Sequence, residues 1–253
     1  MTKLHTTLWN LLRQRRSVTV IPSREALDRA HIGGGDYVAV GNEFLDYFRD
    51  LGSLARTDRV LEVGCGLGRM ARPLSQWLEP PGAYCGFDVA RDSIAWCRKH
   101  IPSSGAPTEF KWVDAANSLY NPAGRIQSDA VTFPYRDATF DFVIAVSVFT
   151  HLLPPAAARY MSEIRRVLRP GGRSFVTWFI WPQQDPSAEA TALFPFAREG
   201  HRVNSTQIPE AAVAYSSESI SSLYAGTILR TVEGHWRAGQ HAAPYQDLVV
   251  ARR

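Results

Sequence analysis

The chain has 253 residues, of which 45% are hydrophobic and 21% charged, with a formal net charge of +4. This length allows one large domain or two small ones with a proper core. The mild charge excludes a strongly basic nucleic-acid-binding protein, although it leaves room for a local basic patch. Cys65, Cys85 and Cys97 lack CxxC spacing, which argues against a disulfide framework and against a zinc or other metal site.

Residues 1–35 are predicted to form an N-terminal helical extension that ends at a run of three glycines. Leucines at helical spacing precede three arginines, but polar residues interrupt them, so this is not a secretory signal. We interpret it as a helix packed on the domain or a frayed arm, with a basic helix on a membrane surface as the alternative. No apolar run approaches the roughly 20 residues that cross a bilayer, so we expect no integral membrane segment and a cytoplasmic location.

From residue 36 onward, apolar runs typical of strands alternate with helical patterns. The predicted helices cover 36–51, 69–78, 92–100 (capped at Asp92), 155–168 (ended by Pro170-Gly171-Gly172) and 217–225. The predicted strands cover 59–63, 83–87, 109–113, 140–146, 174–179, 227–233 and 247–251. This alternation predicts an α/β fold with a doubly wound, mostly parallel sheet and helices on both faces. Two segments, about 115–138 and 180–216, are too long for simple connectors, and we expect them to be irregular loops that carry function.

A glycine-rich turn gives the strongest signal for function. The first strand runs into Gly64, Gly66 and Gly68 at alternate positions, which allows a tight turn and close approach of the backbone to a ligand. This spacing is G-x-G-x-G, whereas the dinucleotide fingerprint is G-x-G-x-x-G. Glu62, two residues before the first glycine, would repel a pyrophosphate but suits an ammonium group. Asp88 ends the next strand, where ribose hydroxyls are held, so a ligand such as S-adenosylmethionine fits both carboxylates.

The sequence resembles the class I S-adenosylmethionine-dependent methyltransferases from about residue 32 to 251. Residues 62–68 and 86–88 match the glycine motif and the ribose-binding acid, and 133–152 and 163–172 resemble the segments around the fourth and before the fifth strand. The resemblance implies a seven-stranded Rossmann-like methyltransferase fold over residues 36–253 with an antiparallel last strand. The implied cofactor is S-adenosylmethionine, with contacts at Glu62, Gly64, Cys65, Gly66, Gly68, Arg69, Asp88, Val89, Asp114, Ala115 and Ser147.

One departure from the family concerns the acid that contacts adenine. In simpler members this acid lies a few residues before a Leu/Phe-Pro-Phe element, which here begins at Phe133. The inserted segment separates Phe133 from Asp114, so Asp114 and Asp129 compete for the role. We favour Asp114 because it directly follows the third strand, at the edge of the sheet where the ligand must lie.

The acceptor of the methyl group is predicted to be a small molecule rather than a nucleic acid. The Asn/Asp-Pro-Pro-Tyr/Phe motif of many base-amino methylases is absent after the fourth strand, and Tyr120-Asn121-Pro122 lies in the wrong loop. We expect O-methylation of a saccharide or specialised metabolite. The alternatives are N- or C-methylation of a metabolite, a nicotinamide-dependent oxidoreductase, or a catalytically silent binding protein, and a homo-oligomer is compatible with the sequence.

Four side chains are candidates for binding the acceptor. The segment 180–216 mixes aromatic and basic residues, which suits an organic molecule with polar or anionic groups, and its length and prolines favour a mobile cover. We therefore name Trp181, Arg198 and His201, together with Tyr37. His151 is the catalytic candidate, as a general base near neutral pH, with a cofactor contact or a structural role as its alternatives.

Overall fold

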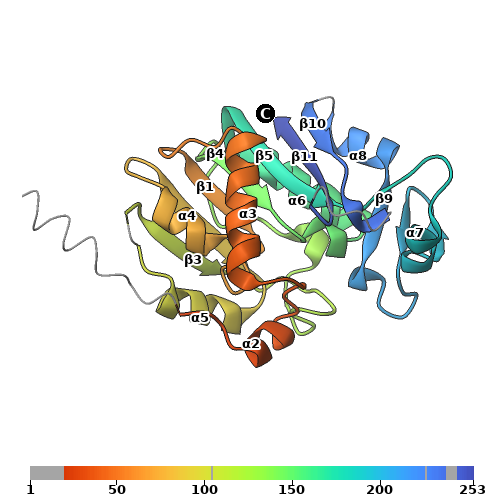
Figure 1. Cartoon of the computed structure of the whole chain (residues 1–253), viewed down its shortest axis with the longest axis horizontal. Helices are drawn as coiled ribbons and strands as arrows, with labels where there is room; N and C mark the ends of the chain where they lie inside the picture. The colour runs from red at the N-terminus through yellow and green to blue at the C-terminus, as the bar shows by residue number, and fades with distance from the viewer. Residues whose placement is uncertain (1–19, 104, 226, 238–243) are drawn as a thin grey trace, which may run out of the picture.

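The computed structural model describes residues 20–103, 105–225, 227–237 and 244–253. Its main body is a seven-stranded sheet in the order β10-β11-β5-β4-β1-β2-β3 (Figure 1). The strands are β1 (Arg59–Val63), β2 (Ala83–Asp88), β3 (Thr108–Trp112), β4 (Phe140–Ala145), β5 (Leu168–Trp178), β10 (Ile228–Val232) and β11 (Asp247–Arg252). Strands β1 to β5 are parallel, and β11 is antiparallel to both neighbours. The predicted doubly wound sheet with an antiparallel last strand is confirmed.

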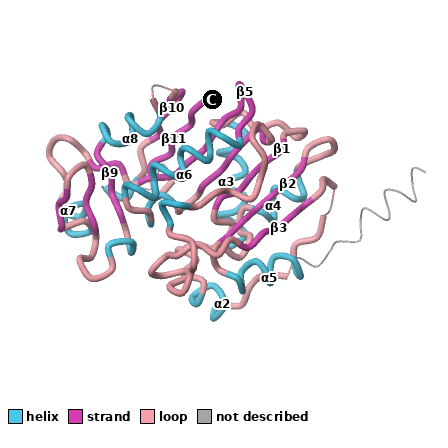
Figure 2. Tube along the Cα trace, turned by 180° about the vertical axis from the view of Figure 1, so that it is seen from behind, coloured by secondary structure: helices cyan, strands magenta, loops and turns pink. Residues whose placement is uncertain are grey.

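Helices cover both faces of this sheet (Figure 2). The helices are α2 (Arg24–Arg29), α3 (Tyr37–Asp50), α4 (Ala71–Trp77), α5 (Arg91–His100), α6 (Pro154–Val167), α7 (Ala188–Leu193) and α8 (Ser217–Tyr224). Because successive side chains of a strand point to opposite faces, Val60 belongs to the core cluster that includes residues of α3, α4 and α5, whereas Leu61 belongs to the cluster that includes residues of α6 and α8. No helix among the described residues is long and apolar enough to cross a membrane. The leucine-rich stretch near residues 4–16 lies outside the described residues.

Three predicted boundaries are wrong in detail. Helix α4 begins two residues later than expected, at Ala71. Asp92 does not cap α5, because the helix begins at Arg91 and Asp88 Oδ1 accepts the Ala90 N–H at 2.7 Å. The turn after α6 lies inside β5, because Leu168 already pairs with Phe140 and the register then shifts through Pro170-Gly171-Gly172.

The segment 180–216 is folded, contrary to the irregular loop that we expected. It holds a four-stranded sheet in the order β6-β9-β8-β7, together with α7 and a 3-10 turn, η3 (Pro209–Ala211). Its strands are β6 (Ile180–Trp181), β7 (Phe196–Arg198), β8 (His201–Val203) and β9 (Val213–Ser216). Phe179, Phe194 and Trp236 form a buried cluster beneath it, and Figure 1 shows α7 at the end of the molecule beyond α8. The segment 115–138 is a loop, as predicted, with isolated bridges and the 3-10 turn η1 (Ser128–Ala130).

Asp247, at the start of β11, joins the two sheets. This side chain is fully buried, and its Oδ2 accepts hydrogen bonds from the Ile180 N–H at 2.7 Å and the Trp236 Nε1–H at 2.8 Å. Its Oδ1 accepts from the Gly234 N–H at 2.9 Å and from Arg237 at 2.8 Å. Four donors therefore depend on one carboxylate.

We expect Asp247→Ala to lower the free energy of unfolding by about 3–5 kcal/mol, because it leaves the buried N–H groups of Ile180 and Trp236 without their acceptor and leaves Arg237 with only the exposed Glu233 as an ion-pair partner. Urea denaturation measures this loss. The exposed Asp50 provides the control, and Asp50→Ala should change the free energy by no more than about 0.5 kcal/mol. A loss below about 1 kcal/mol at Asp247 would show that the two sheets are held together elsewhere.

Candidate active site

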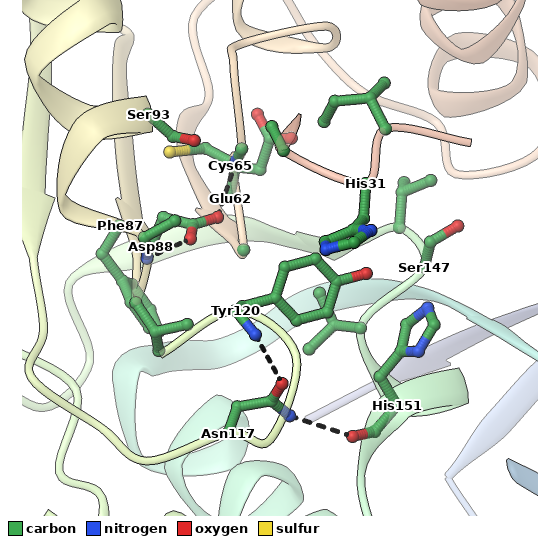
Figure 3. Close-up of a pocket in the computed structure, with 18 of the residues that line it drawn as sticks. His31, Glu62, Cys65, Phe87, Asp88, Ser93, Asn117, Tyr120, Ser147 and His151 are labelled. Carbon is green, nitrogen blue, oxygen red and sulfur yellow. Dashed lines mark hydrogen bonds between the residues drawn. The ribbon is translucent and has the colours of Figure 1, made fainter. Parts of the chain in front are cut away.

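A cavity opens at the carboxyl ends of β1, β2 and β4, where a parallel sheet of this kind binds ligands (Figure 3). The glycine-rich turn, the end of β2, the segment after β4 and part of the 115–138 loop line it. The predicted residues that line it are Glu62, Gly64, Cys65, Gly66, Arg69, Asp88, Val89, Ser147 and His151. Among the described residues, no group of three His, Cys, Asp or Glu side chains is placed to hold a metal ion.

The glycine turn requires glycine for two different reasons. Gly64 has a φ of +70°, and a Cβ there would meet Val148 Cγ2 at 2.5 Å, so a side chain at this position would clash with the cavity wall. Gly68 has a φ of +76°, and a Cβ there would meet Ile101 Cδ1 at 2.1 Å. Gly68 does not line the cavity. It allows the turn to pack against the end of α5, and this packing positions Gly64 and Gly66, which do line the cavity.

Glu62 and Asp88 place two carboxylates along one cavity. Asp88 Oδ2 accepts the Gly66 N–H at 2.6 Å, and burial raises its pKa although this N–H and that of Ala90 lower it. Glu62 is only 3% exposed and accepts the Tyr84 hydroxyl at 2.5 Å. Burial, with a smaller contribution from Asp88, raises the pKa of Glu62 to about 8. In the described part of the chain no cation pairs with Glu62, so the site favours a ligand that brings one.

His151 lies at the opposite end of the cavity, in the 3-10 turn η2 (Phe149–His151). Its Nδ1 is 3.1 Å from the carbonyl oxygen of Glu210. Because a carbonyl oxygen only accepts, Nδ1 carries the proton and Nε2 keeps a lone pair. Burial lowers the pKa of His151, against backbone hydrogen bonds with Glu210 and Ala211 that raise it, and this favours the neutral ring. This arrangement leaves Nε2 able to accept a proton.

Two residues beside His151 are absent from the set predicted from the sequence. The Tyr120 ring contacts His151 and His31 edge to face, with centroid distances of 5.6 and 5.7 Å, and Figure 3 shows it between the two histidines. Asn117 Nδ2 donates to the His151 carbonyl oxygen at 3.4 Å. In the sequence, Tyr120-Asn121-Pro122 lies in the wrong loop for the motif of base-amino methylases. In the structure, Asn117 and Tyr120 of this loop line the cavity. The length of the insertion is the only signal that points to these residues.

Seven predicted site residues lie outside the cavity lining. Gly68, Asp114 and Ala115 were assigned to the cofactor, and Tyr37, Trp181, Arg198 and His201 to the acceptor. Asp114 instead pairs with Arg125 at 2.6 Å, and hydrogen bonds from Arg125 and Asn121 hold its pKa below its usual range. Asp129, the competing acid, does not line the cavity either.

The four acceptor candidates have structural partners. The buried Tyr37 donates its hydroxyl to the Leu67 carbonyl at 2.7 Å. Arg202 lies over the Trp181 ring at 4.3 Å, and Arg198 donates to the Ala197 carbonyl. His201 Nδ1 lies 2.9 Å from the Glu199 carbonyl. Tyr37 therefore supports the glycine turn, while Trp181, Arg198 and His201 belong to the small sheet, and none of the four lines the cavity.

Residues 61–176 match the family model of a methyltransferase domain. The match includes the glycine turn, Asp88 and nearly all of β1 to β5. Together with the order and direction of the strands, it identifies this part of the chain as a class I S-adenosylmethionine-dependent methyltransferase domain. This finding decides against the nicotinamide-dependent alternative.

Similar proteins carry methyltransferase names. A fatty-acid O-methyltransferase of Mycolicibacterium smegmatis is 37% identical over 114 residues, which are 45% of this chain and 34% of the relative. A phthiotriol/phenolphthiotriol dimycocerosates methyltransferase of Mycobacterium tuberculosis is 33% identical over 134 residues, 53% of this chain and 40% of the relative. The chain thus matches less than half the length of these curated relatives. A solved S-adenosylmethionine-dependent methyltransferase from Methanosarcina mazei shares the fold, with a TM-score of 0.57, 18% identity and coverage of 81% of this chain and 96% of that one.

We expect binding of S-adenosylhomocysteine at pH 7 to release close to one proton, because Glu62, with a pKa of about 8, must ionise beside the ligand's ammonium group. Affinity should rise by up to about tenfold from pH 6 to 7, where the ammonium is itself protonated. Titration calorimetry in buffers of different ionisation enthalpy counts the proton. Glu62→Gln should bind more weakly and release none. Release of no proton by the wild type would contradict the assignment of Glu62.

Asp88→Ala should weaken S-adenosylhomocysteine binding by about tenfold or more, because two charge-assisted hydrogen bonds to the ribose are lost. Calorimetry on a variant with native circular dichroism measures the change. Asp129→Ala is the matched control, because this exposed acid lies outside the cavity, and its affinity should stay at the wild-type value. Equal affinities of the two variants would mean that the ribose is held elsewhere.

Proposed function

We propose that this protein transfers the methyl group of S-adenosylmethionine to an uncharged hydroxyl group of a small metabolite, either a saccharide or a specialised natural product. The observation that carries the proposal is His151, oriented by the contact of its Nδ1 with the Glu210 carbonyl, in the same cavity as Glu62 and Asp88. The names of the relatives support a small-molecule acceptor, and they add lipids to the compounds worth testing.

The residues of the cavity fit this cofactor. Glu62 is a buried carboxylate without a cation among the described residues, and it would hold the ammonium group. Asp88 would hold the ribose hydroxyls from the end of β2. Gly64 and Gly66 leave room for the cofactor along the turn. When bound, S-adenosylmethionine supplies a methyl group on a positively charged sulfur.

His151 would act on the acceptor. Its Nε2 would take the proton of the acceptor hydroxyl as that oxygen accepts the methyl group, and the cofactor would leave as the neutral thioether. The Glu210 carbonyl fixes the ring in the tautomer that this step needs, and the lowered pKa keeps it unprotonated at neutral pH. Tyr120 packs on the ring and restricts its rotation. Exclusion of water and alignment of the two reactants supply the remainder of the rate enhancement.

The charges around the cavity favour a neutral oxygen nucleophile. Arg69 is the only Lys or Arg among the described lining residues, and its guanidinium donates to the carbonyls of Gly33 and Gly34. No arginine of the 180–216 segment lines the cavity, so the cations that we expected there for an anionic acceptor are not part of its wall. A protonated amine would need a carboxylate near His151, but the Glu210 side chain does not line the cavity, and its Oε2 accepts the Ser118 N–H at 2.8 Å. These features favour O-methylation over the N- and C-methylation alternatives.

A panel of possible acceptors tests the proposal with tritiated S-adenosylmethionine. We expect label in neutral hydroxyl compounds, such as saccharides, phenols and fatty alcohols. Fatty acids and primary amines of matched carbon skeleton serve as the comparison. Label confined to acids or amines would overturn the proposed acceptor class, and would leave the cofactor assignment intact.

With an acceptor in hand, His151→Ala should lower kcat by about a hundredfold, because the hydroxyl loses its general base. Affinity for S-adenosylhomocysteine should stay within about twofold, which separates loss of a base from loss of a cofactor contact. His201→Ala is the matched control, since this histidine lies outside the cavity. A parallel fall of kcat and affinity would assign His151 to the cofactor instead.

A further inference from the structure

The cavity is closed on one side by a segment that lies outside the matched methyltransferase domain. Ala30, His31, Ile32 and Gly33 line the same cavity as Glu62 and Asp88. They belong to the N-terminal strap, defined here as residues 23–35, which contains α2 and the three glycines before α3. Figure 3 shows His31 facing Tyr120 across the cavity.

The strap covers the glycine turn directly. A Cβ at Gly66 would meet Ile32 Cδ1 at 3.0 Å, so Ile32 lies against the backbone that approaches the ligand. His31 has a φ of +50°, a conformation that non-glycine residues rarely adopt, and its ring contacts Tyr120 edge to face. Such backbone strain persists where the surrounding structure requires it. Ile32 thus lies against the glycine turn, and the adjacent His31 lies against Tyr120, beside His151.

The strap has few other ties to the domain. Helix α2 has no buried residue, and between Val20 and Asp36 only Pro22 is buried. The ion pairs of α2 join its own residues (Arg24 to Asp28 and Arg29 to Glu25). A segment with so few buried contacts opens at low free-energy cost.

Arg69 supplies the connection that the rest of the strap lacks. Its Nη2 donates to the Gly33 carbonyl and its Nη1 to the Gly34 carbonyl at 3.4 Å. Among the described residues, these are the only hydrogen bonds between the strap and the remainder of the chain. Arg69 directly follows Gly68, so the anchor of the strap and the cofactor turn are one continuous piece of chain.

We infer that the N-terminal strap is a cover of the cofactor cavity, that Arg69 is the latch that holds it closed, and that opening of the strap controls release of the cofactor product. Arg69 is then a positioning residue that acts through the strap, and Ile32 and His31 are part of the site. The inference rests on the proposed function in one respect, that the cavity binds S-adenosylmethionine. It gives Arg69, which the sequence assigns to the cofactor, a role through the strap that the exchange measurement separates from a direct ligand contact.

Two variants and one control test this inference in the full chain. Arg69→Gln removes the latch, and Ile32→Ala trims the cover where it meets Gly66. Surface plasmon resonance with S-adenosylhomocysteine should show dissociation about tenfold faster in both variants. The control Arg72→Gln removes a neighbouring arginine that bonds Asn42 and the Val38 carbonyl on α3, and its dissociation rate should match the wild type.

Hydrogen exchange of the free protein separates a latch from a direct ligand contact. Without any ligand, Arg69→Gln should speed the exchange of amides in residues 30–34 by about tenfold relative to the wild type and Arg72→Gln. Unchanged exchange in Arg69→Gln, or unchanged dissociation in both variants, would overturn the inference. Failure of the wild type to bind S-adenosylhomocysteine would instead overturn the proposed function, and the exchange measurement would still decide whether Arg69 is a latch.

Discussion

The site depends on a carboxylate that folding buries without a counter-charge. Glu62 has the Tyr84 hydroxyl as its side-chain hydrogen-bond donor, and burial raises its pKa from 4.5 to about 8. Across this pH window the unfolded chain loses the proton while the folded chain keeps it. The folded state therefore binds more protons, and this group makes the protein less stable as the pH rises from about 4.5 to 8. A ligand ammonium relieves that cost, so binding and stability are coupled at this residue.

The cofactor half of the site could be predicted from the sequence because its signals are local. Glu62 and the glycines lie within seven residues of one another, and Asp88 ends the next apolar run. Buried strands alternating with helices fix where those residues meet, since parallel strands carry their carboxyl ends to one edge of a sheet. The same alternation predicted the mostly parallel sheet, and the family resemblance implied the antiparallel last strand. The prediction was wrong at the turn after α6, in the 180–216 segment and at helix ends, where short hydrogen bonds such as that from the Ala90 N–H to Asp88 decide the boundary.

The acceptor half could not be predicted because tertiary structure assembles it. The rings that meet there are far apart in sequence: about 90 residues separate His31 from Tyr120, and about 30 separate Tyr120 from His151. No spacing pattern in the sequence predicts their contacts. In the 180–216 segment, composition was misleading. Arg202 donates to the carbonyls of Phe194 and Pro195, so a residue type that often binds anions here completes the backbone hydrogen bonding of a small sheet. A side chain's chemistry indicates its function only when its partners are known.

The two insertions meet at His151, and this explains what the comparisons can and cannot reveal. Asn117 from the first insertion and the Glu210 carbonyl from the second both bond His151, and Ser118 bonds the Glu210 side chain. Glu210 and His31 lie outside the matched residues 61–176. Similarity to other methyltransferases therefore covers the carboxylates that face the cofactor, while segments outside it complete the surroundings of the proposed base. Burial opposes charge on Glu62, Asp88 and His151 alike. The positive charge of the cofactor then stabilises the carboxylates at one end, and the neutral imidazole remains ready for an uncharged hydroxyl at the other.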